Sequence, residues 1–104
     1  FMHFLAQKGE WEGRRLLHPA WFEAACRKQI DTPGDPSRPD GEWGWGYGFQ
    51  CWMGSVPGSF RADGAYGQFG FLYPDLELEI ITTAAVQRTQ ILVDCVKETL
   101  LPAV

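Results

Sequence analysis

An arginine and an aspartate stand directly before a glycine-rich corner in residues 58–75. Arg61 and Asp63 precede Gly64, and two more glycines follow within six residues. Glycine lets the backbone turn and lets other atoms approach it closely. The sequence therefore predicts strand, corner and strand, with two charged side chains delivered where they could take part in chemistry.

Covalent catalysis needs an activated serine, cysteine or lysine with a base nearby. None of the serines, at positions 37, 55 and 59, has a lysine three residues later, and no Gly-x-Ser-x-Gly elbow occurs. No cysteine adjoins a histidine. The chain by itself is therefore not expected to carry a nucleophilic site.

Glu77 and Glu79 form another candidate pair, because side chains two residues apart on a strand share a face. Paired carboxylates could serve acid–base catalysis, but they need a cleft and a raised pKa. The alternative is the solvated face of a strand, and this is the interpretation that we favour.

The cysteines, Cys26, Cys51 and Cys95, are widely separated and odd in number. They form no C-x-x-C pair, so neither a zinc site nor a disulfide framework is expected. We interpret them as reduced, partly buried thiols of a cytoplasmic protein. Phosphate-binding loops and EF-hand spacings are absent, and no cofactor or metal is predicted.

The composition is typical of a globular chain with one modest core. The formal net charge of −4 and a pI near 5.0 argue against a nucleic-acid surface, which requires a basic patch. No apolar run approaches the roughly 20 residues of a membrane span, and no signal peptide is visible. The chain opens on Phe1 within an apolar helical pattern, as expected of a fragment.

Helical periodicity predicts a first helix over residues 1–8 and a second over residues 19–28. Pro19 suits the first position of the second helix, since its missing N–H would be unpaired there. His18 before it is expected to be a cap or a surface group. Residues 29–42 are rich in proline and glycine and are predicted to form a loop.

Aromatic residues and glycines alternate over residues 43–54, which predicts a strand packed into a core; stacking of sugars or bases is the alternative. Further strands are predicted over 59–63, 67–73 and 76–83, and an amphipathic helix over 84–102. The predicted fold class is α+β: a single domain with an antiparallel sheet of about four strands, a C-terminal helix packed on it and two short N-terminal helices.

Three stretches, taken in order, resemble the serine β-lactamase-like hydrolases, the family of class C β-lactamases, penicillin-binding-type peptidases and related esterases. Residues 9–21 resemble the family's connection between two helices, K-G-x-W-x-G-x-x-L-L-S-x-x-W. Residues 46–52 resemble its strand Y-G-Y-G-x-x-W. Residues 58–75 resemble the strand with the third active-site motif, G-x-x-x-[H/K]-T-G, and the strand after it. The resemblance covers nearly the whole chain and implies a partial β-lactamase-like fold.

The resemblance also implies a set of site residues. The family's Lys-Thr-Gly or His-Thr-Gly triplet falls on Ala62-Asp63-Gly64, so Ala62 stands where the family has a cation, and Arg61 lies beside it on the opposite strand face. Asp63 stands where the threonine touches substrate, or else it caps the turn. Ala65 matches the residue whose backbone N–H forms half of the oxyanion hole. Arg61, Ala62, Asp63 and Gly64 are thus the candidate substrate-binding residues, and Ala65 is the candidate catalytic donor.

The family's Ser-x-x-Lys and Tyr-x-Asn motifs lie N-terminal to this region and do not occur here. The chain is therefore expected to be inactive alone and to contribute to amide, ester or lactam hydrolysis through an acyl-enzyme in a longer protein. The rest of that hydrolase, or a second copy, would cover an exposed apolar sheet face; the substrate would be a small molecule or a peptide. The alternative is a non-catalytic binding or assembly module in which Trp43, Trp45 and Trp52 recognise a peptide or a glycan.

Overall fold

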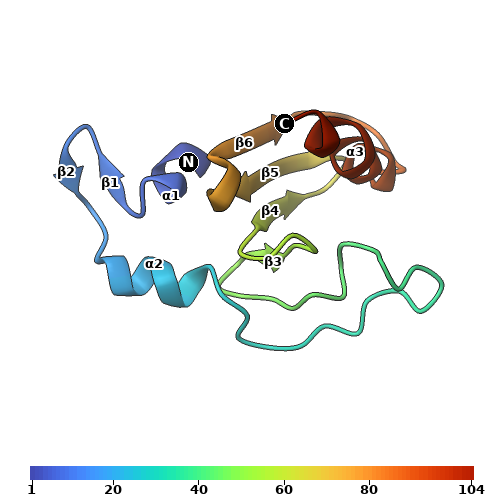
Figure 1. Ribbon diagram of the computed structural model, residues 1–104, viewed down its shortest axis with the longest axis horizontal. Helices are drawn as coiled ribbons and strands as arrows, with labels where there is room; N and C mark the ends of the chain where they lie inside the picture. Colours follow the sequence, from blue (N-terminus) through green and yellow to red (C-terminus); the bar gives the residue numbers. More distant parts are fainter.

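An antiparallel sheet of four strands forms the centre of the protein (Figure 1). The computed structural model describes all residues, 1–104. The strands lie side by side in sequence order: β3 (Trp52–Met53), β4 (Phe60–Gly64), β5 (Gln68–Tyr73) and β6 (Leu78–Thr82). With a C-terminal helix and short N-terminal helices around it, this sheet confirms the predicted α+β class.

Two short helices and a hairpin precede the sheet: α1 (Met2–Ala6), β1 (Glu10–Trp11), β2 (Arg14–Arg15) and α2 (Pro19–Ala25). The first helix is shorter than predicted because Lys8 and Gly9 adopt left-handed φ angles of 53° and 85°. Glu12 and Gly13 also have positive φ, which gives the tight turn between β1 and β2. The stretch predicted only as a connection is therefore a small hairpin.

The start of α2 follows the prediction. His18 is the N-cap, its Nδ1 accepting a hydrogen bond from the Ala20 N–H at 3.2 Å, and Pro19 occupies the first turn. The helix ends at Ala25 rather than at residue 28, because Cys26 has non-helical angles, φ −97° and ψ 22°.

The strand predicted over residues 43–54 is wrong except for β3 at its end. Gly46 has φ of 111° and Gln50 has φ of 61°, and both turn the chain out of an extended conformation. Tyr47 makes only isolated bridges, to Ile30 and Trp52. Residues 43–51 are thus a folded loop, here called the aromatic loop, because glycine supplies turns that alternation alone does not reveal.

The first part of the predicted strand 76–83 is also not extended. Pro74–Leu76 forms a 3-10 turn, η1, and Glu77 has φ of 49°, so β6 starts at Leu78. Glu77 therefore lies outside the strand that carries Glu79, so the shared strand face on which the pairing was predicted does not form.

The C-terminal helix begins later than predicted. α3 (Gln90–Cys95) continues through a π-helical turn, η2 (Val96–Leu100), into a 3-10 turn, η3 (Leu101–Ala103). Residues 84–89 are not helical, because the Val86 N–H donates to Tyr66 O at 3.1 Å and holds this segment against the corner between β4 and β5. None of the helices combines the length and the apolar character that crossing a bilayer would require.

Residues 29–42 form a loop, as predicted, and hydrogen bonds attach it to neighbouring elements. Thr32 Oγ1 donates to Trp43 O at 2.7 Å and accepts from the Gly46 N–H at 3.0 Å, which joins it to the aromatic loop. Arg38 Nη2 donates to Asp94 Oδ1 at 2.8 Å, which joins it to α3.

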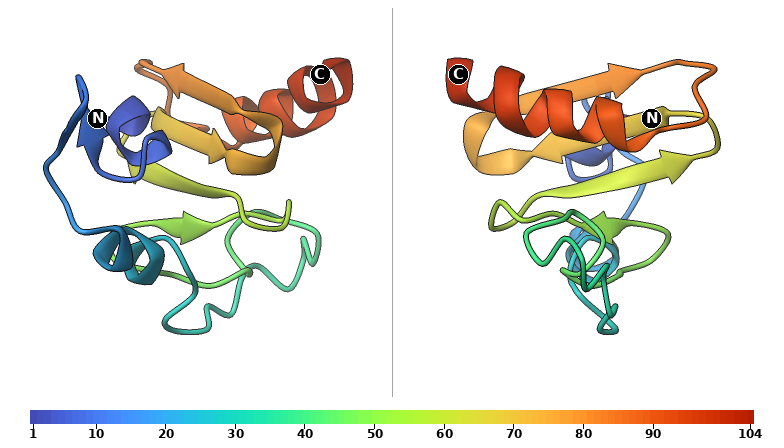
Figure 2. Two further views of the ribbon diagram at one scale, coloured as in Figure 1. Left: turned by 60° about the vertical axis from the view of Figure 1, so that its left-hand side comes forward. Right: turned by 90° about the vertical axis from the view of Figure 1, so that its right-hand side faces the viewer.

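Both faces of the sheet are covered (Figure 2). On the face here called the α1 face, α1 and α2 contribute to a core with β3, β4 and β5: Met2, Leu5, Phe22, Cys51, Met53, Phe60 and Leu72. On the opposite face, the α3 face, the buried core residues are Phe69, Phe71, Tyr73, Val93 and Val96. Residues 69–73 of β5 are all buried, whereas Ile81 on the edge strand β6 is 58 % exposed. The expected cover of an apolar sheet face by a partner stays a prediction.

Candidate functional site

A shallow groove of about 440 Å³ opens beside the corner that joins β4 to β5. Three of the predicted site residues, Asp63, Gly64 and Ala65, line it. The other lining residues come from the aromatic loop, β3, the corner and the segment before α3: Trp43, Trp52, Tyr66, Gln87 and Thr89. The corner and two tryptophans thus border one hollow.

The corner is held firmly by the segments beside it. Tyr66 and Gly67 turn the chain with φ angles of 63° and 94°. Thr82 Oγ1 donates to Gly67 O at 2.7 Å, and the Val86 N–H donates to Tyr66 O at 3.1 Å. Ala65 lines the groove, and its N–H has no acceptor within the chain, so this backbone donor is free.

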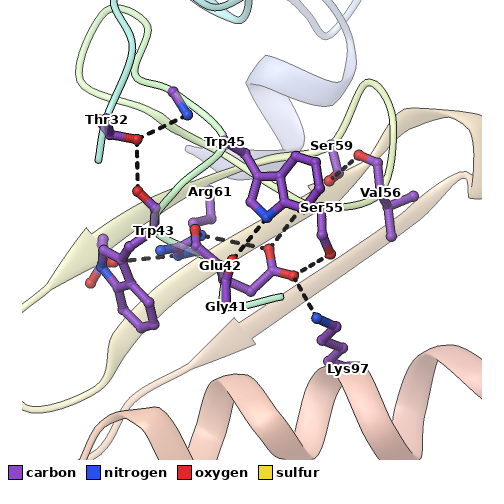
Figure 3. Close-up of polar contacts among 12 residues, drawn as sticks. Thr32, Gly41, Glu42, Trp43, Trp45, Ser55, Val56, Ser59, Arg61 and Lys97 are labelled. Atoms are coloured by element: carbon purple, nitrogen blue, oxygen red, sulfur yellow. Dashed lines mark hydrogen bonds and ion pairs between the residues drawn. The ribbon is translucent and has the colours of Figure 1, made fainter. Parts of the chain in front are cut away.

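A buried arginine, Arg61, lies against the ring of Trp43 (Figure 3). The Arg61 side chain is 1 % exposed, and its Cζ lies 4.6 Å from the ring centroid of Trp43 and 5.9 Å from that of Trp52. Its Nη1 donates to Glu42 O at 2.9 Å, and its Nε donates to Asp63 Oδ2 at 3.3 Å. Arg61 therefore holds in position two groove-lining side chains, the ring of Trp43 and the carboxylate of Asp63.

Burial disfavours the charged forms of both Arg61 and Asp63. It lowers the pKa of Arg61, and the nearby carboxylates of Asp63 and Glu42 only partly offset this. It raises the pKa of Asp63, against the opposing effect of Arg61. The two shifts agree in cause, since each group loses hydration on entering the protein. The Nη2 atom of Arg61 is buried without a hydrogen-bond partner, which adds to the cost.

Glu42 completes the polar network on the α3 face. Its Oε2 accepts from the Ser55 N–H at 3.0 Å, its Oε1 accepts from Ser55 Oγ, and Lys97 Nζ lies 3.7 Å from Oε1. Figure 3 shows Glu42 between Arg61 and Lys97. Burial, with the nearby Glu42 carboxylate, raises the pKa of Tyr73 to about 12. Neither Glu42 nor Lys97 gives a sequence signal, because each is a lone charge in a polar segment.

The structure separates the five predicted site residues. Asp63, Gly64 and Ala65 meet in the groove. Ala62, which stands where the family has its cation, packs against the core of the α1 face instead. Arg61 lies on the α3 face, but its guanidinium is covered and bonded to protein atoms. The groove therefore has no exposed cation in the place that the resemblance would give it.

Each serine hydroxyl has a partner that is not a base of the Ser-Lys or Ser-His kind. Ser55 Oγ donates to Glu42, Ser59 Oγ donates to Val56 O at 2.6 Å, and Ser37 Oγ donates to Asp35 Oδ1 at 2.7 Å. No three histidine, cysteine, aspartate or glutamate side chains come together in a way that could hold a metal ion.

A second hollow, of about 470 Å³, lies at the other end of the sheet between α1 and η1. His3 Nδ1 lies 2.7 Å from Glu79 Oε1, and His3 Nε2 lies 3.1 Å from Gln7 Nε2. This pairing joins α1 to β6 across the sequence, and neither histidine spacing nor the glutamate pattern predicts it. The His3 side chain is 59 % exposed and that of Glu79 is 25 % exposed, and neither a serine nor a cysteine lines the hollow.

Neither the family models nor the curated proteins include one that matches this sequence.

Proposed function

We propose that this chain is the C-terminal segment of a serine hydrolase related to the β-lactamases and penicillin-binding-type peptidases. In this proposal it supplies one wall of the substrate pocket and one oxyanion donor, the backbone N–H of Ala65. The observation that carries the proposal is the free N–H at the groove edge, directly after Gly64 at the end of β4. Such a donor stabilises the negative charge that develops on a carbonyl oxygen during acyl transfer.

The proposal assigns the nucleophile to a segment outside these 104 residues. Within them, the hydroxyls of all three serines donate to other groups, and no lysine or histidine activates them. The groove is bordered by aromatic side chains and by a single carboxylate, Asp63. It therefore suits a neutral or apolar acyl group better than one that relies on an exposed cation for binding.

A test for covalent labelling examines the chain alone. Incubation with a penicillin and with a nitrophenyl ester should give no burst of product and no adduct by intact mass. An adduct on any residue of this chain would contradict its assigned role. The coding sequence upstream should encode Ser-x-x-Lys followed by Tyr-x-Asn; their absence would remove the basis for a hydrolase.

The oxyanion role is tested in the longer protein. Ala65→Pro removes the N–H, and kcat/KM should fall roughly 100- to 1,000-fold, as for loss of one oxyanion donor. Ala65→Gly keeps the N–H and is the matched control, with activity close to wild type. Circular dichroism establishes that both variants are folded. Equal activity of folded Ala65→Pro and wild type would exclude the assignment.

A binding module is the second candidate, because Trp43 and Trp52 line the same groove. Trp45, predicted to act with them, instead donates its Nε1–H to Gly41 O at 2.8 Å and lines a different hollow. Titration with short peptides and oligosaccharides, followed by tryptophan fluorescence, tests this candidate. Binding that is lost in Trp52→Ala, with no hydrolytic activity in the longer protein, would favour it over the hydrolase.

A further inference from the structure

Two cysteine side chains that are distant in the sequence meet in the core of the α1 face. Cys26 is the C-terminal cap of α2, and Cys51 directly precedes β3. Cys51 is buried in this core, Cys26 is half-buried and packs against the same core, and the two thiols are close enough to shift each other's pKa. The third cysteine, Cys95, is exposed and lies on α3.

Backbone hydrogen bonds bring the segments that carry these two cysteines together. The Phe49 N–H donates to Ala25 O at 2.9 Å, and the Gly48 N–H donates to Cys51 O at 2.8 Å. A Cβ placed on Gly48 would lie 2.3 Å from Ala25 O, so the aromatic loop passes directly against the end of α2. The thiol contact is therefore part of a fixed junction between α2 and the aromatic loop.

Once the pair of thiols has lost one proton, the two sulfur atoms can share the proton that remains. The S–H of Cys26 lowers the pKa of Cys51, while burial opposes this, and the same hydrogen bond together with burial raises the pKa of Cys26. Transfer of that proton to Cys51 leaves a thiolate at Cys26, the more accessible sulfur. Either thiolate is stabilised by the neighbouring S–H.

Cys26 is reached through a hollow of about 310 Å³, lined in part by Arg27, Lys28 and Trp45. Two cations at its rim favour the approach of an anionic reagent. Arg27 and Lys28 are both exposed. Lys28 Nζ donates to Asp31 Oδ1 at 2.7 Å, whereas the Arg27 guanidinium forms no ion pair within the chain and is the cation more available to solutes.

We propose that Cys26 and Cys51 are a redox-active dithiol, oxidised to a disulfide by a small anionic disulfide of the glutathione type. The Cys26 thiolate attacks one sulfur of the reagent, which forms a mixed disulfide and releases one thiol. The Cys51 thiolate then attacks Cys26 Sγ, which forms the internal disulfide and releases the second thiol. The two protein thiols lose two electrons and two protons, and the reagent is reduced to two thiols.

The test is oxidation of the chain with glutathione disulfide, followed by alkylation and peptide mapping. The wild-type chain should lose the mass of two hydrogen atoms through a Cys26–Cys51 bond, and Cys95 should stay open to alkylation or carry glutathione. Adducts at Cys95 alone, with Cys26 and Cys51 still reduced, would overturn the proposal.

Single variants separate the two steps. Cys51→Ser should keep a stable mixed disulfide at Cys26, because no second thiol resolves it. Cys26→Ser should leave the buried Cys51 unmodified while the chain stays folded by circular dichroism. Cys95→Ser is the matched control and should form the internal bond at the wild-type rate. Modification of Cys51 in folded Cys26→Ser at the wild-type rate would contradict the role of Cys26 as the entry point.

The charge of the reagent provides a further readout that does not depend on a cysteine variant. Glutathione disulfide should react roughly tenfold faster than the cationic disulfide cystamine at low salt. Replacement of both cations, Arg27→Gln with Lys28→Gln, should remove this preference. Faster reaction with cystamine in the wild-type chain would contradict the anionic class of oxidant.

Discussion

The two faces of the sheet differ in what they bury. The α1 face packs aliphatic, aromatic and sulfur-containing side chains around Phe60 and Leu72. The α3 face contains an apolar core too, but beside it lies the guanidinium of Arg61, enclosed by Trp43, Glu42 and Asp63. Hydrophobic burial accounts for the first arrangement. The second requires that each buried charge keep its partners.

This difference shows that the charged side chains whose burial is unfavourable lie on the α3 face. Burial disfavours the charged forms of Arg61 and Asp63, yet the two side chains hold Trp43, Trp52 and the end of β4 in position. The groove opens on the same side. The α1 face stabilises the sheet, and the α3 face stabilises it while also shaping a site.

The largest effect is expected from Arg61→Ala. It leaves Asp63 as a buried carboxylate without its cation, while Glu42 keeps Ser55 and Lys97, and the free energy of unfolding should fall by about 4 kcal/mol at neutral pH. Because the pKa of Asp63 is already raised, acidification neutralises that charge, and the loss should become smaller at about pH 4. Urea unfolding at the two pH values measures this; an equal loss at both would mean that packing, not charge, dominates.

Leu72→Ala tests the other face with a change of comparable size. Leu72 is 2 % exposed and belongs to the core of the α1 face. The truncation should lower the free energy of unfolding by about 3 kcal/mol. This loss should not change between neutral and acidic pH, because no charge loses its partner. A pH-dependent loss, measured by the same urea titrations, would erase the contrast between the faces.

Substitution of two glycines, one in the corner before β5 and one on β5, compares the two faces through smaller losses of stability. Gly67 has φ of 94°, and a Cβ there would lie 2.6 Å from Leu92 Cδ1 on the α3 side. A Cβ on Gly70 would lie 2.5 Å from Met2 Cγ, on a flexible side chain of the α1 side. Gly67→Ala should cost about 2 kcal/mol through backbone strain, and Gly70→Ala about 1 kcal/mol. Thermal unfolding ranks the two; the reverse order would show that Met2 cannot move aside.

The smallest effect concerns the ion pair that joins residues 29–42 to α3. The hydrogen bond from Arg38 holds the pKa of Asp94 below its usual range. A carboxylate with a lowered folded pKa adds stability above its unfolded pKa of about 3.9, and this is lost as pH falls through the folded value. Asp94→Asn should therefore lie closest to wild type in acid. Urea midpoints across this range test the direction; a stability gap that stays constant would contradict it.

The regular parts of the fold could be predicted because their periodicity is local. Alternating apolar residues located β4 and β5, and His18-Pro19 located the start of α2. The errors arose where tertiary contacts decide the conformation. The bond from Val86 to Tyr66 replaces the first turns expected of the last helix, and positive φ at Gly46 breaks up the expected long strand.

The groove was predictable only in part. The corner at Gly64 and Ala65 follows from glycine spacing, and the structure places both at the groove. The enclosure of Arg61 and Glu42 could not be predicted, because charged residues are normally exposed and their partners lie on other elements. The contact between Cys26 and Cys51 has no sequence signal either, since it depends on how the aromatic loop passes α2.

The short first helix has a consequence for how the protein folds. α1 has five residues and is too short to be stable by itself, yet Met2 lies over Gly70 and His3 bonds to Glu79. The four strands can pair through contacts between sequence neighbours, whereas this helix must find partners some seventy residues away. We therefore expect α1 to dock late in folding and to detach early in local opening, so that its amide protons should exchange with solvent before those of β5.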